Sequence, residues 1–266
     1  MNALKNIRLK QSNYDLMLEG VERTKYQNTM QTIIHRAADR GYADHGWLKA
    51  NHSFSFGQWY NPEKIHFGAL RVLNDDKVAA GMGFGTHPHD NMEIITIPLK
   101  GAVHHKDSMG NDGIVSTGEV QVMSAGTGIM HSEFNGSKTD DLELFQIWIF
   151  PNEKDVTPRY DQMAIETTEM RNQFLQLVGP KSSEKGVWIH QEAYIHMAEL
   201  DAETTLTYAL KSPKNGIYML AVEGELSIDN EQLNLRDAAG ISGTSSVDIS
   251  AKTASKVLVI EVPMNF

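Results

Sequence analysis

Residues 81–93 read Gly-Met-Gly-Phe-Gly-Thr-His-Pro-His-Asp-Asn-Met-Glu, a glycine-rich approach that leads into two histidines and a glutamate. Side chains two positions apart on a β-strand point to the same face, so a strand here would place His87 and His89 side by side. Glu93, four positions after His89, can join that face by the same rule. The glycines let the chain bend tightly into the strand. The segment therefore predicts a β-strand that carries half of a metal site.

A second segment of the same kind lies further along the chain. Residues 124–135 read Ser-Ala-Gly-Thr-Gly-Ile-Met-His-Ser-Glu-Phe-Asn, and His131 and Glu133 again share a strand face. If the two strands lie close together inside a barrel, His87, His89, His131 and Glu133 converge. Three neutral imidazoles and one carboxylate suit Fe(II), and the same ligand types also allow Mn, Ni, Cu or Zn. Such a site can leave coordination positions open for a substrate oxygen and for dioxygen.

The pattern around both segments favours an all-β fold. Short runs rich in branched and aromatic residues alternate with Gly/Asn/Asp clusters at a spacing of roughly 8–12 residues, which is typical of a β-sandwich or barrel. Residues 151–186 hold three prolines and many charges, and the β pattern returns at residue 187. We therefore expect an N-terminal extension over 1–29, a metal-bearing domain over 30–150, a linker or crossover over 151–186 and a second β domain over 187–266.

The composition excludes several classes of site and partner. The 266 residues include no cysteine, so disulfides, cysteine-based zinc sites, iron–sulfur clusters and thiol nucleophiles are absent. A formal charge of −10 argues against direct binding of nucleic acid. No run of about 18 apolar residues predicts a membrane span, and the first 30 residues lack the apolar core of a signal peptide. The expected location is the cytoplasm.

Longer runs around the histidines resemble the cupin superfamily and, in closer detail, its pirin family. The first cupin motif is matched by Gly81-x5-His87-x-His89-x3-Glu93. The second is matched from Gly118 through His131-x3-Asn135, although Ser124 stands where the motif usually has proline. Pirin hallmarks are matched by residues 40–48, 52–56, 83–89, 105–111 and 124–129. The resemblance covers residues 30–266 and implies a bicupin: two β-barrel, jelly-roll domains, the N-terminal barrel binding a metal and the C-terminal barrel degenerate.

The resemblance also bears on the acidic ligand. In cupins generally this ligand comes from the first motif, which here is Glu93, whereas in pirins it comes from the second, which here is Glu133. The implied metal ligands are therefore His87, His89, His131 and Glu133. Glu93 is then expected to be a buried partner that orients a ligand imidazole.

The other histidines are expected to play lesser roles. Adjacent strand residues face opposite sides, so at most one of His104 and His105 points inward, and neither is expected to bind metal. His45 and His52 lie in aromatic-rich loops that either frame a pocket mouth or form core. The histidines of the C-terminal half are expected only to pack.

The pirin resemblance implies a metal-dependent dioxygenase that cleaves flavonols such as quercetin, a quercetin 2,3-dioxygenase-type oxidoreductase. Its partners would be a small aromatic substrate and dioxygen, its cofactor a mononuclear divalent metal, most simply Fe(II), and Glu133 its catalytic base. The alternative is a non-enzymatic, metal-dependent regulator that binds a protein partner, as some pirins do. An enzyme needs a substrate-sized cavity at the metal, and a regulator needs an exposed patch that responds to metal state. A third hypothesis, a cupin isomerase or decarboxylase acting on a small acid, would require basic residues such as Lys100 or Lys106 near the ligands.

Overall fold

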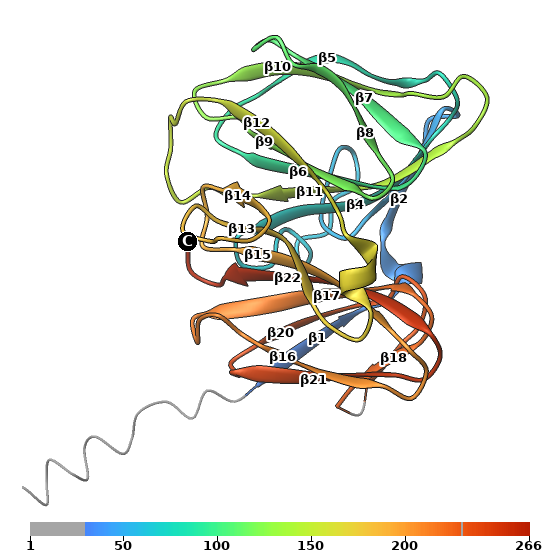
Figure 1. Ribbon diagram of the computed structural model, residues 1–266, viewed down its shortest axis with the longest axis vertical. Helices are drawn as coiled ribbons and strands as arrows, with labels where there is room; N and C mark the ends of the chain where they lie inside the picture. The colour runs from blue at the N-terminus through green and yellow to red at the C-terminus, as the bar shows by residue number, and fades with distance from the viewer. Residues whose placement is uncertain (1–29, 230) are drawn as a thin grey trace, which may run out of the picture. The chain divides into compact units, whose positions relative to one another are not determined.

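The chain is described by a computed structural model that covers residues 30–229 and 231–266. The expected extension over residues 1–29 lies outside the described residues. The described part consists of β-strands and two short 3-10 helices, η1 (Ala37–Asp39) and η2 (Thr167–Met170). The strands form four sheets (Figure 1), which confirms the all-β, two-barrel class. Within this part no helix is long and apolar enough to cross a membrane.

The N-terminal half pairs a large sheet with a small one, and neighbouring strands are antiparallel throughout. The large sheet has the order β12-β9-β6-β11-β4-β3-β2, and the small sheet has the order β5-β10-β7-β8. Their bounds are β2 (Gly41–Asp44), β3 (Leu48–His52), β4 (Leu70–Val78), β5 (Gly83–His89), β6 (Glu93–Lys100), β7 (Ala102–Asp107), β8 (Asp112–Ser116), β9 (Glu119–Ser124), β10 (Ile129–Asn135), β11 (Leu142–Ile149) and β12 (Arg159–Ala164).

The C-terminal half also pairs a large sheet with a small one, but its strands β13 and β14 are parallel. Its large sheet has the order β1-β20-β17-β22-β15-β13-β14, and its small sheet has the order β16-β21-β18-β19. The bounds are β1 (Gln31–His35), β13 (Leu175–Pro180), β14 (Val187–Ile189), β15 (Tyr194–Leu200), β16 (Thr205–Ala209), β17 (Asn215–Glu223), β18 (Leu226–Ile228), β19 (Glu231–Leu233), β20 (Ala238–Ser242), β21 (Ser246–Ala251) and β22 (Ser255–Pro263).

Two strands lie in a different half from the one that chain order suggests. β1 pairs with β20, so the first described strand completes the C-terminal large sheet. β12 lies within the expected linker but pairs with β9 of the N-terminal sheet. The domain limits drawn from the sequence therefore remain predictions, and residues 31–266 form one compact unit.

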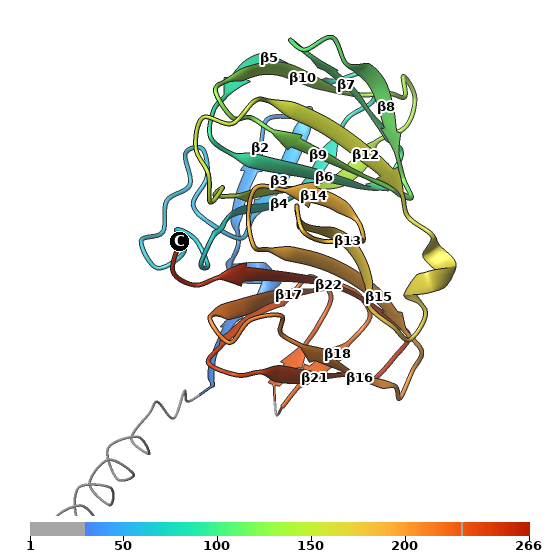
Figure 2. The same cartoon turned by 60° about the vertical axis from the view of Figure 1, so that its left-hand side comes forward.

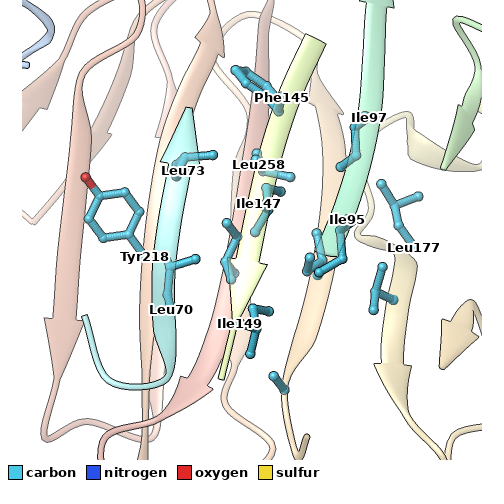
Figure 3. Packing of buried hydrophobic residues seen from close by; sticks show 14 of the residues in the cluster. Leu70, Leu73, Ile95, Ile97, Phe145, Ile147, Ile149, Leu177, Tyr218 and Leu258 are labelled. Atoms are coloured by element: carbon cyan, nitrogen blue, oxygen red, sulfur yellow. The ribbon is translucent and has the colours of Figure 1, made fainter. Parts of the chain in front are cut away.

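The main hydrophobic core takes its residues from both large sheets, which lie against each other in Figures 1 and 2. Figure 3 shows Ile95 of β6 and Ile147 of β11 among side chains of the C-terminal half such as Leu258 and Tyr218. Burying one such aliphatic side chain stabilises the fold by roughly 1.5–3 kcal/mol. Because strand residues alternate between faces, the neighbours of these residues on β6 and β11 point instead into the N-terminal barrel. That inner face carries the candidate site.

Candidate metal centre

Strands β5 and β10 bring the predicted histidines together inside the N-terminal barrel. Their antiparallel register sets His131 directly opposite His87, and His89 follows His87 on the same face. The nitrogens of His87, His89 and His131 that could bind a metal all lie within 4.8 Å of one another. The Nε2 atoms of His87 and His131 are 3.0 Å apart. Three of the four predicted ligands thus converge on one point.

Glycine makes this close pairing possible. A Cβ atom on Gly83 would lie 2.3 Å from the carbonyl oxygen of Glu133, a distance that no side chain tolerates. Gly81, just before β5, has φ +69°, a left-handed conformation that favours glycine. The glycines that precede His87 therefore allow β5 to pair closely with β10.

The protonation of the cluster suits a cation. Burial, followed by the neighbouring imidazoles His131 and His87, lowers the pKa of His89 to about 4. Burial, then His87 and His105, lowers the pKa of His131 to about 3. Both rings are therefore neutral near pH 7. His87 Nδ1 lies 2.8 Å from the carbonyl oxygen of Gly85, which can only accept, so Nδ1 carries the hydrogen and Nε2 offers its lone pair.

These observations show that the residues fit a divalent metal ion. Imidazole nitrogens that converge on one point are donors that Fe, Ni, Cu and Zn ions bind. In addition, the buried Nδ1 of His131 has no hydrogen-bond partner among the described residues. The orientation of the His131 ring is thus set by packing and by Nε2, the nitrogen that faces the cluster.

Glu133 lies beside the cluster on the same strand as His131. Its carboxylate accepts hydrogen bonds from Gln146 Nε2 at 3.0 and 3.2 Å and from Thr96 Oγ1 at 3.2 Å. Its ligand atom groups with those of His131 and His105, and not with the three-histidine set. A ligand role for Glu133 remains a prediction, whereas its position within the same barrel interior is a finding.

His105 points into the barrel, and His104 points out. His105 is fully buried on β7 and lies opposite Glu133 in the register of β7 and β10. Its Nε2 is 3.2 Å from Asp107 Oδ2, and its buried Nδ1 has no partner among the described residues. His104 is instead exposed and bonds Asp112. Strand alternation predicts that at most one of the pair faces inward, but local spacing does not predict that this residue lies opposite Glu133.

Glu93 does not orient an imidazole, contrary to expectation. Its carboxylate accepts a hydrogen bond of 2.7 Å from the hydroxyl of Ser124, the residue that replaces the usual proline. Burial raises the pKa of Glu93 to about 7, against the opposing effects of Ser124, the backbone of His190 and Arg159. The physical reason is that the two residues lie on different strands: β5 ends at His89, and Glu93 begins β6 in the other sheet. The spacing rule therefore does not carry over from His89 to Glu93.

A cavity of about 440 Å³ opens onto the histidine cluster, within the size range of small-molecule sites. Its apolar walls include Trp47, Phe56, Phe84 and Trp148, and the Trp148 ring packs edge-on against His89 with centroids 4.9 Å apart. Trp47 and Phe56 come from the aromatic-rich loops for which the sequence left a pocket mouth and a core position open, and both line the cavity. His52 lines the same cavity, whereas His45 lies in an adjoining hollow. Within the described part of the chain, the cavity lining contains no lysine or arginine.

Two family models match the chain: Pirin over residues 34–149, and the quercetinase C-terminal cupin domain over residues 176–262. The chain belongs to the pirin family. A protein named quercetin 2,3-dioxygenase from Escherichia coli O157:H7 is 39% identical over 230 residues, which cover 86% of this chain and 98% of the relative. A pirin-like protein from Caulobacter vibrioides is 39% identical over 222 residues, 83% of this chain and 95% of the relative.

Solved structures agree with this membership. A bacterial pirin from Escherichia coli, solved in complex with nickel(II), superposes with a TM-score of 0.83 at 38% identity, covering 88% of this chain and 99% of the other. The region matched by the Pirin model contains the whole three-histidine cluster of this pirin. The metal-ligating groups that the described residues offer all lie in that half.

The C-terminal half of this pirin uses its buried polar residues for packing. His196 Nδ1 lies 3.2 Å from the hydroxyl of Tyr208, which in turn donates to Glu261 at 2.9 Å. Glu261 is fully buried and also accepts hydrogen bonds from the amide of Asn215 and the backbone of Lys211. A buried carboxylate satisfied in this way is a structural feature.

Proposed function

We propose that this pirin is a metal-dependent dioxygenase that cleaves flavonols such as quercetin. The observation that carries the proposal is the three-histidine cluster of His87, His89 and His131 at the wall of an aromatic-lined cavity of about 440 Å³. Relatives named quercetin 2,3-dioxygenase and a nickel(II) complex of a pirin at 38% identity support it.

The proposed metal ligands are His87, His89, His131 and Glu133. Three imidazoles and one carboxylate suit Fe(II), with Mn, Ni, Cu and Zn as alternatives, because protein ligands alone rarely select the metal. A divalent ion held there would stabilise negative charge on a substrate oxygen and bring that oxygen and dioxygen together.

The protein's own groups would prepare the substrate. Glu133, held by Gln146 and Thr96, would accept the proton of the flavonol 3-hydroxyl at a carboxylate oxygen. The flat rings of the substrate would lie among Trp148, Phe56 and Trp47, whose apolar surfaces exclude water. The overall reaction inserts both atoms of dioxygen into the flavonol, cleaves the heterocycle and releases carbon monoxide.

The cavity favours the enzyme over the other two hypotheses. A regulator does not need a substrate-sized hollow at its metal, whereas an enzyme does. A small acidic substrate would need cationic groups in the wall, but Lys106 is exposed and bonds Asp112 on the outer face of the small sheet.

The test combines metal analysis with an aerobic assay of quercetin consumption and carbon monoxide release. The metal-loaded protein is expected to contain about one ion per chain and to release about one carbon monoxide per quercetin consumed, whereas chelator-treated protein is inactive. Metal-loaded protein that leaves quercetin intact would overturn the proposal.

A further inference from the structure

A buried carboxyl oxygen in the cavity wall has no hydrogen-bond partner among the described residues. Asp76 lies on β4, is 5% exposed and lines the cavity of the histidine cluster. Its Oδ1 atom is buried and has no hydrogen-bond partner among the described residues. Its register partners are Ala50 on β3 and Leu144 on β11, which offer no polar side-chain atom.

The adjacent polar groups of this wall form hydrogen bonds with polar neighbours. One register step away, His52, Asn74, Gln146 and Thr96 form a continuous row across strands β3, β4, β11 and β6. His52 Nδ1 lies 2.9 Å from Asn74 Oδ1, and both Gln146 and Thr96 bond Glu133. Asp76 stands outside this network on the same face of β4.

An unsatisfied buried polar group destabilises the folded state, and a charged one destabilises it more. Native proteins satisfy the great majority of such groups, so the exceptions indicate ligands or catalytic roles. The same cavity wall is rich in aromatic rings, which select a flat aromatic ligand. A hydrogen-bonding group on an aromatic molecule in this cavity would supply the partner that Asp76 Oδ1 lacks.

We propose that Asp76 is a specificity-determining residue that binds a phenolic hydroxyl of the substrate, at a wall separate from the strands that carry the histidine cluster. This inference rests on the proposed function and narrows its substrate class to aromatics that carry a hydroxyl beyond the one directed at the metal. Asp76 comes from β4 of the large sheet, whereas the three histidines come from β5 and β10 of the small sheet. A substrate that spans the cavity can thus be held at both ends.

The protonation of Asp76 agrees with a neutral hydroxyl as its partner. Burial, then the charges of Asp75 and Glu133, raises the pKa of Asp76 to about 8. A carboxyl that is largely protonated near neutral pH can both donate to and accept from a phenol. An ammonium group would instead require the ionised form.

The test measures the equilibrium binding of flavonols to the Ni(II)-loaded protein in the absence of oxygen. Binding is monitored through the quenching of tryptophan fluorescence. Quercetin is compared with 3-hydroxyflavone, which keeps the hydroxyl directed at the metal and lacks all the others. The wild type is expected to bind quercetin about tenfold more tightly, the effect of one good hydrogen bond. Asp76→Leu is expected to lose this preference. Its affinity for quercetin should fall about tenfold, whereas its affinity for 3-hydroxyflavone should change by less than about twofold.

Matched variants separate recognition from folding. Asp76→Asn keeps the size of the side chain and is expected to retain part of the preference. Glu143→Gln removes a partly exposed carboxylate from the neighbouring strand and should bind both flavonols like the wild type. Equal weakening of both ligands in Asp76→Leu, or unchanged quercetin binding, would overturn the assignment. Tighter binding of tyramine than of quercetin, lost in Asp76→Leu, would reassign the carboxyl to a cation and also overturn it.

The binding assay separates this inference from the proposed dioxygenase activity. If the wild type shows the binding preference, Asp76→Leu loses it and no aerobic turnover occurs, the proposed function fails and the role of Asp76 stands. If turnover occurs and Asp76→Leu keeps the wild-type preference, the role of Asp76 fails alone.

Discussion

At the scale of single residues, His89 offers the sharpest test of the cluster. Its imidazole is neutral near pH 7 and packs against Trp148, so it is held in place with its lone pair available. We expect His89→Ala to lose most of the bound metal, as measured by elemental analysis of the purified protein. His104→Ala, which removes an exposed imidazole from the outer face of β7, should retain it. Near-stoichiometric metal in His89→Ala would contradict the ligand assignment.

The two buried glutamates of this half should differ in their effect on turnover. Glu133 is held in the cavity by Gln146 and Thr96, whereas Glu93 bonds Ser124 on the opposite face of β6. We expect Glu133→Gln to abolish quercetin turnover, since loss of a general base typically lowers the rate by about 10²–10⁴-fold. Glu93→Gln should reduce kcat only weakly. The reverse ranking would move the acidic function to Glu93.

Asp76 should lower stability in a pH-dependent way. Its folded pKa of about 8 lies above the ordinary value of 3.8, so the folded state holds a proton that the unfolded state releases. Stability is therefore lost as the pH rises from the unfolded pKa towards 8. We expect Asp76→Asn to raise the Tm of the metal-free protein, and by more at pH 8 than at pH 5. A gain that is equal at both pH values would show that the native carboxyl is not strained by burial.

At the scale of strands, the pairing of β5 with β10 decides the geometry of the site. A Cβ atom on Gly83 would clash with the backbone of Glu133 and Phe134, whereas one on Gly85 meets nothing within 4 Å. We expect Gly83→Ala to separate the two strands and to weaken metal binding at least about tenfold, as measured by competition with a chelator. Gly85→Ala is the matched control and should bind metal nearly as well as the wild type. Equal affinities in the two variants would show that strand pairing does not set the ligand positions.

The same strands show what the sequence could and could not predict. The i, i+2 rule placed His87 with His89, and His131 with Glu133, because each pair lies on one continuous strand. It failed for Glu93, because Asn91 adopts φ +45° in the turn between two strands of different sheets. The burial of His105 and Asp76 depends on which strands are neighbours and in what register. That information comes from the assembled sheets and not from local spacing.

At the scale of the described molecule, the two halves depend on each other for their core. β1 crosses to the C-terminal sheet and β12 returns to the N-terminal one, so strand pairing ties the start and the middle of the chain together. On β11, the apolar residues Phe145, Ile147 and Ile149 pack against the other half, whereas Gln146 and Trp148 line the cavity.

Because the core is shared, residues 31–266 should unfold in one cooperative transition. Ile147 is fully buried between the large sheets, and its truncation to alanine should lower the free energy of unfolding by about 2–5 kcal/mol. At roughly 2–4 °C per kcal/mol for a chain of 150–250 residues, the Tm should fall by several degrees or more. Calorimetry should show one peak in both proteins, and the fluorescence of Trp148 and of Trp188, in opposite halves, should change together.

Ile33→Ala, which shortens a side chain that is 56% exposed, should leave the Tm nearly unchanged. Two separate peaks, with only the first lowered by Ile147→Ala, would instead mean that each barrel is stable without the shared core.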